Sequence, residues 1–381
     1  PFIETVRQMK WELGKDCAVV HLTLVPFLSA AGELKTKPTQ HSVKTMLEQG
    51  VQPDIIVCRT EHHLNEGIKR KIAQFCNVNP TSVIESIDAE TIYDVPLLMR
   101  EEKLDIEVLK VTGTKIPNKI DLSKWEKFVY SLKNPKGEVN IGLVGKYVEL
   151  KDAYKSINEA LVHGGTENQY KVNVISIQSE HLNIDNVDEQ LKALDGILVA
   201  PGFGGRGIEG KIEAVKYARE NKIPFLGICL GMQCAAIEFS RNILGLKGAN
   251  TTEIDSETKF PVIDLMEDQK SVTNLGGSMR LGLYDCSIDV NSKTYKEYNK
   301  KDIKERHRHR YEFNNEFRDK FTNNGMILAG INKEKNLVEI IELEDHPWFI
   351  GVQFHPEYKS TVKAPHPLFT GFIKAAIDKK V

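Results

Sequence analysis

The stretch Pro224-Phe-Leu-Gly-Ile-Cys229-Leu-Gly-Met-Gln-Cys234 joins a short apolar segment to residues that favour a helix. Gly227 and Gly231 stand two residues on either side of Cys229, which is the pattern of a nucleophile elbow with cysteine in the place of serine. Glycine suits both positions because the turn is sharp and the two backbones pass close together. Backbone N–H groups at a helix start favour a thiolate and can bind an oxyanion. We predict that Cys229 is a nucleophile, although a lone buried cysteine is more often structural.

A second motif, Gly351-Val-Gln-Phe-His355-Pro-Glu357, ends an apolar segment in His-x-Glu. This spacing lets the imidazole and the carboxylate share a hydrogen bond on a tight bend. His355 would then act as base and acid for the thiol, and Glu357 would fix its tautomer and orientation. Cys229, His355 and Glu357 in this chain order resemble the class I (triad) glutamine amidotransferases. That resemblance implies the fold and the glutaminase activity of those enzymes.

The composition is that of a globular protein with two domains. The chain has 381 residues, of which 41% are hydrophobic and 27% charged, and its net charge is −2. This charge balance argues against a nucleic-acid or membrane partner, and no apolar run approaches ~18 residues. The six cysteines show no metal-ligand spacing. Because one of them is a candidate catalytic thiol, we expect a reducing, cytoplasmic location.

Strand-like and helix-like segments alternate through the first third of the chain. Helical periodicity is present from Pro1 to Lys10, and the apolar run from Asp16 to Leu28 predicts a strand covered on both faces. Further strands are expected at 54–59 and 83–88, and helices at 42–48, 65–75 and 92–101. This alternation indicates a doubly wound, mostly parallel α/β sheet.

The same pattern restarts after an amphipathic helix at 121–132. Strands are predicted at 139–145, 172–177, 196–200 and 224–228, and helices at 152–162, 209–220 and 368–377. Apolar runs at 279–285, 326–330 and 337–342 suggest antiparallel additions to this second sheet. The glycine-rich stretch at 200–207 would let main-chain N–H groups approach a ligand, or would be only a flexible loop.

The segment Lys35-Thr-Lys-Pro-Thr-Gln40 precedes a helix and carries two lysines and two threonines. Helix N–H groups, hydroxyls and ammonium groups together can hold a polyanion. A solvated basic loop is the alternative, and on spacing alone we leave both open. Lys71 lies in a basic run on the next predicted helix, where such runs are usually solvated.

Four strings occur together and in order: 35–40, 227–233, Glu305-Arg-His-Arg-His-Arg-Tyr-Glu312 and Phe354-His-Pro-Glu357. With them the whole chain resembles the cytidine triphosphate (CTP) synthase family. The resemblance implies that residues 1–118 are the C-terminal part of a P-loop-type amidoligase domain, 119–137 a linker with a helix, and 138–381 the glutaminase domain. No G-x-x-x-x-G-K-[ST] string is present, and the family's phosphate loop and magnesium carboxylates lie upstream. We therefore expect a fragment that hydrolyses glutamine but makes no CTP, with no metal ligands in this chain.

In this family, ammonia from glutamine converts UTP to CTP with ATP and Mg²⁺, late in pyrimidine nucleotide synthesis. By position, the resemblance implies three groups of contacts. The glutamine site would contain Gly202, Leu230, Gly231, Met232, Gln233, Glu253 and Arg310; the UTP and CTP site Lys35, Thr36, Lys37, Pro38, Thr39, Gln40 and Lys71; and the ATP site Asp88 and Ala89. Pro201 has no N–H, so an oxyanion donor must come from Gly202 or Phe203.

The family also implies GTP as an allosteric activator, CTP as a feedback inhibitor, and homotetramers that can form filaments. Met266 to Gly277 falls where the family has a mobile lid tied to GTP. Two alternatives stay open from the sequence: another class I glutamine amidotransferase, and a nucleotide-binding assembly module without synthetase activity. A nucleic-acid role for the Arg306–Arg310 cluster is disfavoured, because it is a basic patch of only five residues on a slightly acidic chain.

Overall fold

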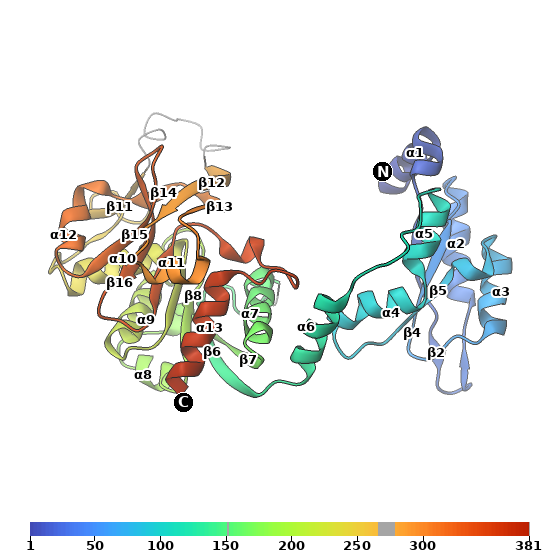
Figure 1. The fold of residues 1–381 in the computed structure, drawn as a ribbon, viewed down its shortest axis with the longest axis horizontal. Helices are drawn as coiled ribbons and strands as arrows, with labels where there is room; N and C mark the ends of the chain where they lie inside the picture. Colours follow the sequence, from blue (N-terminus) through green and yellow to red (C-terminus); the bar gives the residue numbers. More distant parts are fainter. Residues whose placement is uncertain (151, 266–278, 381) are drawn as a thin grey trace. The chain divides into compact units, whose positions relative to one another are not determined.

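The computed structural model describes residues 1–150, 152–265 and 279–380, so the predicted lid at 266–277 lies outside the described residues. The chain divides into two compact units, Pro1–Val129 and Tyr130–Val381 (Figure 1). Each unit is an α/β fold; the sheet of the first is parallel and that of the second contains five parallel strands with antiparallel additions, which confirms the predicted fold class. Helix α6 (Ser123–Lys133) spans the boundary between them.

The first unit contains a three-stranded parallel sheet in the order β1-β4-β5. Its strands are β1 (Val20–Leu24), β4 (Ile55–Thr60) and β5 (Val83–Ile87). Apolar residues of α2 (Lys37–Glu48) and α3 (Glu66–Cys76) pack on one face, and those of α4 (Val95–Glu101) and α5 (Leu104–Val111) on the other. Helix α1 (Phe2–Leu13) begins the unit, and β2 (Phe27–Leu28) and β3 (Glu33–Leu34) form a two-stranded hairpin.

The predicted strand at 16–28 is shorter and less covered than expected. Its regular part is β1, and the side chains of Val20, Leu22 and Leu24 are 42%, 66% and 57% exposed. The prediction of a strand covered on both faces is wrong, because α4 and α5 pack against residues of β4 and β5 and not against β1. In the part of the chain that the structure describes, one face of β1 is therefore uncovered.

The second unit is built on a nine-stranded sheet in the order β13-β12-β15-β16-β17-β9-β8-β6-β7. Five neighbouring strands are parallel: β6 (Gly137–Gly145), β7 (Tyr170–Gln178), β8 (Gly196–Val199), β9 (Phe225–Ile228) and β17 (Phe349–Val352). The antiparallel additions predicted from the sequence are confirmed as β12 (Arg280–Ile288), β15 (Met326–Asn332) and β16 (Leu337–Leu343), next to β13 (Asp302–His309). A small second sheet joins β10 (Asn250–Thr251), β11 (Pro261–Leu265) and β14 (Tyr311–Phe313).

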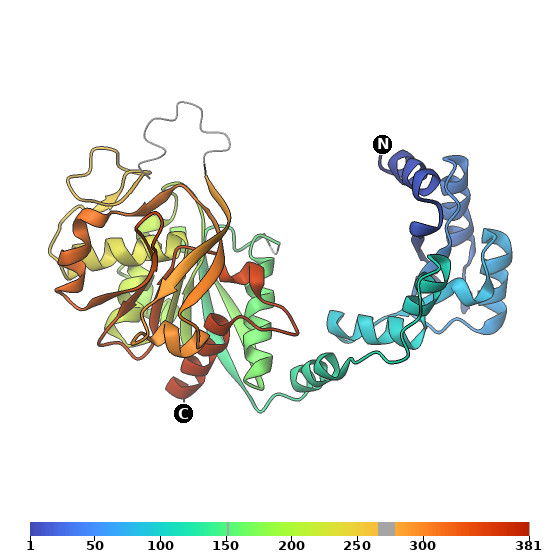
Figure 2. The same ribbon diagram turned by 45° about the horizontal axis from the view of Figure 1, so that its top comes forward.

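Helices cover both faces of this sheet (Figures 1 and 2). Apolar residues of α7 (Lys155–Glu167) and α13 (Pro367–Lys380) form the core on one face, and those of α9 (Ile208–Glu220) and α10 (Leu230–Asn242) the core on the other. The peripheral helices are α8 (Val187–Leu191), α11 (Lys293–Tyr298) and α12 (Arg318–Thr322).

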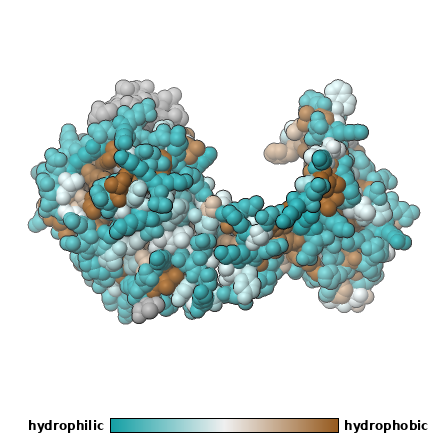
Figure 3. All heavy atoms as spheres, in the orientation of Figure 1, coloured by the Kyte–Doolittle hydropathy of each residue, from teal (hydrophilic) through white to brown (hydrophobic). Residues whose placement is uncertain are grey.

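On the face drawn in Figure 3, hydrophilic residues cover most of each unit and hydrophobic residues form small patches. Among the described residues, no helix has both the length and the apolar character to cross a membrane.

Candidate active site

Cys229 occupies a strained turn between β9 and α10. It is the residue before the first turn of the helix and has φ 53° and ψ −103°, a conformation that L side chains rarely adopt. Its N–H donates to the carbonyl of Val352, 2.7 Å away, on the neighbouring strand β17. A Cβ at Gly231 would lie 2.2 Å from the carbonyl oxygen of Val199, and one at Gly227 would lie 2.8 Å from the backbone of Gly231. The two glycines therefore let β8, β9 and α10 pack closely enough to form the elbow.

His355 and Glu357 leave the same edge of the sheet as Cys229. Strands β9 and β17 are parallel, with Ile228 opposite Val352, so the residues that follow each strand are neighbours. The His355 Nδ1 and the Glu357 Oε1 are 2.8 Å apart, and both side chains are buried. The ring of His355 also stacks on Tyr358, with ring centroids 5.1 Å apart. The sheet register thus brings together three residues that lie up to 128 positions apart in the sequence.

The environment of His355 favours its protonated form. Burial lowers the pKa of the imidazole, but the neighbouring Cys229 sulfur, followed by the carboxylate of Glu357, outweighs it and raises the pKa to about 11. The buried Nε2 of His355 makes no hydrogen bond with the described part of the chain. The site therefore favours an imidazolium next to the sulfur.

A pocket opens beside the Cys229 sulfur and contains the charged residues expected for an amino-acid ligand. It is lined by Gly202, Phe203, Cys229, Gln233, Glu253, Met279, His309, Arg310 and Tyr311. One oxygen of the Glu253 carboxylate accepts a 2.7 Å hydrogen bond from the N–H of Gly204. The pocket thus has a thiol, a carboxylate and a guanidinium on its wall, the groups that an amide carbon, an α-ammonium and an α-carboxylate require.

The remaining predicted glutamine contacts lie elsewhere in the elbow. Leu230, Gly231 and Met232 form the first turn of α10 and do not line the pocket. The side chains of Leu230 and Met232 are buried in the core between the sheet and α9. Only their backbone groups are therefore suited to contact a ligand at this site.

The glycine-rich loop at 200–207 is held from behind by side chains that the sequence analysis did not identify. The ammonium group of Lys146 hydrogen-bonds to the carbonyl of Phe203. The Nζ of Lys211, which is fully buried, donates to the carbonyl of Ala200 at 2.6 Å. Burial lowers the pKa of Lys211 to about 8, even though the charges of Cys234 and Cys229 oppose the shift. With Glu253 on the N–H of Gly204, these contacts argue against the alternative of an unrestrained flexible loop.

Sequence reasoning also missed several lining residues, although a signal for one of them was present. In β13 the exposed arginines alternate with buried histidines, so His307 and His309 share the inner face of the strand. A period of two in Arg-His-Arg-His-Arg places His309 toward the core and hence into the pocket wall. Met279 and Tyr311 had no such signal, because one precedes β12 and the other begins β14, at the ends of strands.

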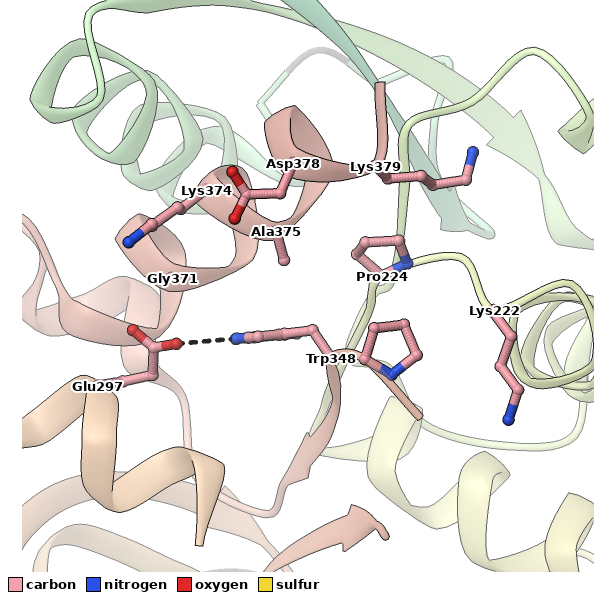
Figure 4. A pocket seen from close by; sticks show the side chains of 10 residues that line it. Lys222, Pro224, Glu297, Trp348, Gly371, Lys374, Ala375, Asp378 and Lys379 are labelled. Carbon is pink, nitrogen blue, oxygen red and sulfur yellow. Dashed lines mark hydrogen bonds between the residues drawn. The ribbon is translucent and has the colours of Figure 1, made fainter. Parts of the chain in front are cut away.

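A larger hollow lies at the opposite ends of the same strands (Figure 4). It is lined by Pro224 and Trp348, which precede β9 and β17, and by residues of α13. The indole N–H of Trp348 donates to Glu297 at 2.9 Å, and the ammonium groups of Lys222 and Lys379 point away from the hollow toward main-chain carbonyls. It contains none of the predicted site residues, so the pocket at Cys229 is the candidate site.

In the first unit, the predicted nucleotide residues surround the entrance of α2. Lys37 begins this helix and its Nζ lies 5.9 Å from the ring centroid of Phe75 on α3. Lys35 forms an ion pair with Glu33, and the pKa of Glu33 is lowered by the hydrogen bond and charge of Lys35 and also by the charge of Lys71. The structure therefore brings the three lysines together, but it adds an acidic residue that a bound polyanion would have to displace.

The polar residues of the same segment have intramolecular partners. Thr39 is fully buried, and its hydroxyl lies 3.1 Å from that of Thr23 and from the carbonyl of Leu24. The buried amide of Gln40 donates to the hydroxyl of Thr36 at 3.1 Å. These side chains position the helix entrance, and Pro38 in its first turn has no N–H to offer a ligand.

The predicted ATP residues Asp88 and Ala89 follow β5 at the carboxyl end of the small sheet. Asp88 forms an ion pair with Arg59, which stands near the end of β4. The entrance of α2 contacts the end of β1 at this same end of the sheet, so the predicted contacts at 35–40 and 88–89 lie at the carboxyl ends of the strands, whereas Lys71 lies within α3. Arg59 is a further basic residue there that the sequence analysis did not select.

Comparison with known proteins assigns both units to families. Residues 149–375 match the model described as glutamine amidotransferase class-I, and residues 1–113 match that described as CTP synthase N-terminus. The CTP synthases of Christiangramia forsetii and Flavobacterium psychrophilum are each 62% identical to all of this chain, which covers 70% and 71% of their lengths. The solved glutaminase domain of Trypanosoma brucei CTPS with bound acivicin is 36% identical with a TM-score of 0.59, covering 63% of this chain and 94% of that domain. The chain therefore belongs to the CTP synthase family, and its second unit is a class-I glutamine amidotransferase domain.

Proposed function

We propose that the second unit hydrolyses L-glutamine with Cys229, His355 and Glu357 as its catalytic residues. The observation that carries this proposal is the convergence of a strained cysteine at a helix start and a buried His–Glu pair at one sheet edge. The Glu253 and Arg310 side chains on the pocket wall support an amino-acid substrate. Glu253 would hold the α-ammonium of glutamine, and Arg310 would pair with its α-carboxylate.

In this mechanism the Cys229 sulfur attacks the side-chain amide carbon of glutamine. The raised pKa of His355 supports an imidazolium that has taken the thiol proton and then donates it to the departing ammonia. The C–N bond breaks as a thioester forms, and water then releases glutamate and regenerates the thiol. The N–H groups of Gly202 and Phe203, on the loop held by Lys146 and Lys211, are the candidate oxyanion donors.

We further propose that the released ammonia serves CTP formation from UTP, the reaction named for the family. The three lysines around α2 support UTP or CTP binding by charge, with Thr36, Pro38, Thr39 and Gln40 shaping the helix entrance. Asp88 and Ala89 at the same sheet edge support an adjacent ATP. GTP activation, CTP feedback and assembly into tetramers or filaments belong to this proposal as properties of the family.

Magnesium chemistry does not enter the steps assigned to this chain. Among residues 1–150, 152–265 and 279–380, no group of three or more His, Cys, Asp or Glu side chains is arranged to hold a metal ion. The described residues therefore do not fit a complete Mg²⁺ site, and we derive no step through one.

The test is glutamate release from glutamine by the purified chain and two cysteine variants. Cys229→Ala should reduce release by at least ~10²-fold, because the nucleophile is gone. Cys234→Ala is the matched control: it lies in the next turn of α10 and is fully buried, but it does not line the pocket. Equal rates for wild type and Cys229→Ala would refute the glutaminase proposal. A chain that binds UTP without releasing glutamate would instead favour a nucleotide-binding assembly module.

A further inference from the structure

Gln353 is a fully buried amide immediately after β17, the strand that pairs with β9. It interrupts the apolar run Phe349-Ile-Gly-Val-Gln-Phe354, so its polar atoms need partners inside the protein. The Nε2 of Gln353 lies 3.6 Å from the Sγ of Cys229, within hydrogen-bond distance for sulfur. No role has been assigned to it so far.

The orientation of this amide follows from a backbone carbonyl. The carbonyl of Tyr311 can only accept, so the Gln233 atom 3.1 Å from it is the NH₂ group. The same Nε2 of Gln233 lies 3.2 Å from the Gln353 side chain and donates its second hydrogen there. The Gln353 atom at this contact is therefore the amide oxygen, which can only accept. The NH₂ of Gln353 is left to face Cys229, and it faces the sulfur as a donor. Both amides are less than 4% exposed, so water does not compete for these contacts.

A donor at this position favours the thiolate over the thiol. A negatively charged sulfur is a better acceptor than a neutral one, and hydrogen bonds to a charged group are stronger in a buried site. We propose that Gln353 is a catalytic residue of the glutaminase site, donating to the Cys229 sulfur and oriented by Gln233. This inference rests on the proposed glutaminase function.

The contact would act in thioester formation and again in thioester hydrolysis. It stabilises the sulfur as a nucleophile before the C–S bond forms, and as a leaving group when water replaces it in the thioester and the C–S bond breaks. The same contacts define which atom of Gln233 can bind a ligand. Both of its amide hydrogens are used within the protein, so only its oxygen is left for a glutamine ligand.

The experiment measures the rate of Cys229 alkylation by iodoacetamide as a function of pH, followed by mass spectrometry of the Cys229 peptide. The midpoint of this rate–pH curve should rise by about one pH unit in Gln353→Met, because the thiolate loses a hydrogen bond. It should rise further in Gln353→Glu, which places a carboxylate beside the sulfur. The matched control is Asn332→Leu: this side chain is 2% exposed and donates to the carbonyl of Asp285 at 2.7 Å, so its loss also removes a buried amide. It should leave the midpoint unchanged.

Glutaminase kinetics and a second variant complete the test. Gln353→Met should lower kcat/KM about 10-fold with circular dichroism like that of the wild type. If Gln353→Met does not fold, Gln233→Met removes the orienting amide, and a smaller rise of the midpoint is expected. A midpoint that stays at the wild-type value in the folded variants overturns the inference. A midpoint that rises in a chain releasing no glutamate contradicts the glutaminase proposal but supports the contact to sulfur.

Discussion

Cys229 and His355 are the residues on which the proposed chemistry depends, and each is held by its backbone as much as by its side chain. The N–H of Cys229 donates to Val352, and that of His355 donates to the carbonyl of Arg306, each at 2.7 Å. These bonds tie both residues to neighbouring strands. A positive φ at a non-glycine residue persists only where such surroundings compensate for it.

His346 gives a prediction for acid stability. Its Nε2 lies 3.1 Å from the carbonyl of Ala218, and its Nδ1 accepts a hydrogen bond from the N–H of Trp348, so the ring is neutral in the fold. Burial lowers the pKa of His346 to about 4 from an ordinary 6.5. A lowered pKa contributes stability that is fully present above pH 6.5 and lost as the pH falls toward 4.

We therefore expect wild type to lose about 3 kcal/mol more free energy of unfolding between pH 7 and 4 than His346→Asn does. The Asn oxygen can still accept from the Trp348 N–H, which preserves the local turn. Urea unfolding at a series of pH values measures both curves, each referred to its own value at pH 7. Parallel curves would show that His346 is not the acid-sensitive group.

The elbow depends on how closely α10 approaches the strands. A side chain at Gly231 would meet the carbonyl of Val199 at 2.2 Å, and neither backbone can move without disturbing β8 or the helix. By contrast, an added Cβ at Gly202 has its nearest neighbour at 3.4 Å, the end of the Leu230 side chain. The close approach is therefore a property of the strand–helix junction, and the glycine loop is less crowded at Gly202.

Gly231→Ala should lower the free energy of unfolding by about 2–3 kcal/mol, because overpacking forces a backbone shift. The same shift would move Cys229 and reduce glutamate release. Gly202→Ala serves as the control for stability and should change it by less than about 1 kcal/mol. Thermal unfolding compares the stability of the two variants. Equal melting temperatures would mean that α10 can move away from β8 at little cost in free energy.

The entrance of α2 gives a prediction about the nucleotide site. Lys37→Ala should weaken the binding of UTP and of CTP by a similar factor, since both carry the same triphosphate. Glu33→Gln should strengthen both, because it removes the anion that pairs with Lys35. Calorimetric titration at fixed salt compares the variants, and affinities that do not respond to either change would argue against this site.

At the level of the whole chain, the two units have separate cores. Every apolar cluster described for the first unit ends before residue 112, and those of the second lie within 139–377. Helix α6 and the residues after it connect them. The nine-stranded sheet, the elbow and the His–Glu pair all belong to the second unit.

A polypeptide of residues 134–381 should therefore fold and release glutamate at a rate within about 10-fold of the full chain's, because it contains a complete core and all proposed catalytic residues. Its thermal transition should coincide with one transition of the 381-residue chain. Failure of this polypeptide to fold, or a rate near zero in a folded sample, would show that the first unit is needed for the glutaminase site.

The sequence by itself determined the fold class, the order of most strands and helices, and the proposed triad. It did so because these features depend on local patterns: apolar alternation, glycines around one cysteine, and His-x-Glu after a strand. The family resemblance, confirmed by the comparisons, added the glutamine and nucleotide residues. The same local patterns do not specify which elements cover β1, because coverage of a strand depends on the helices that reach it, and in the described part of the chain one of its faces is uncovered.

Only the tertiary structure decided which residues surround the Cys229 sulfur. The parallel register of β9 and β17 places Gln353 beside it, and the carbonyl of Tyr311 orients that amide through Gln233. Buried partners such as Lys211, which reaches the carbonyl of Ala200 from α9, likewise come from other elements. No local pattern specifies such contacts, because each depends on sheet register and helix packing that bring together residues distant in sequence.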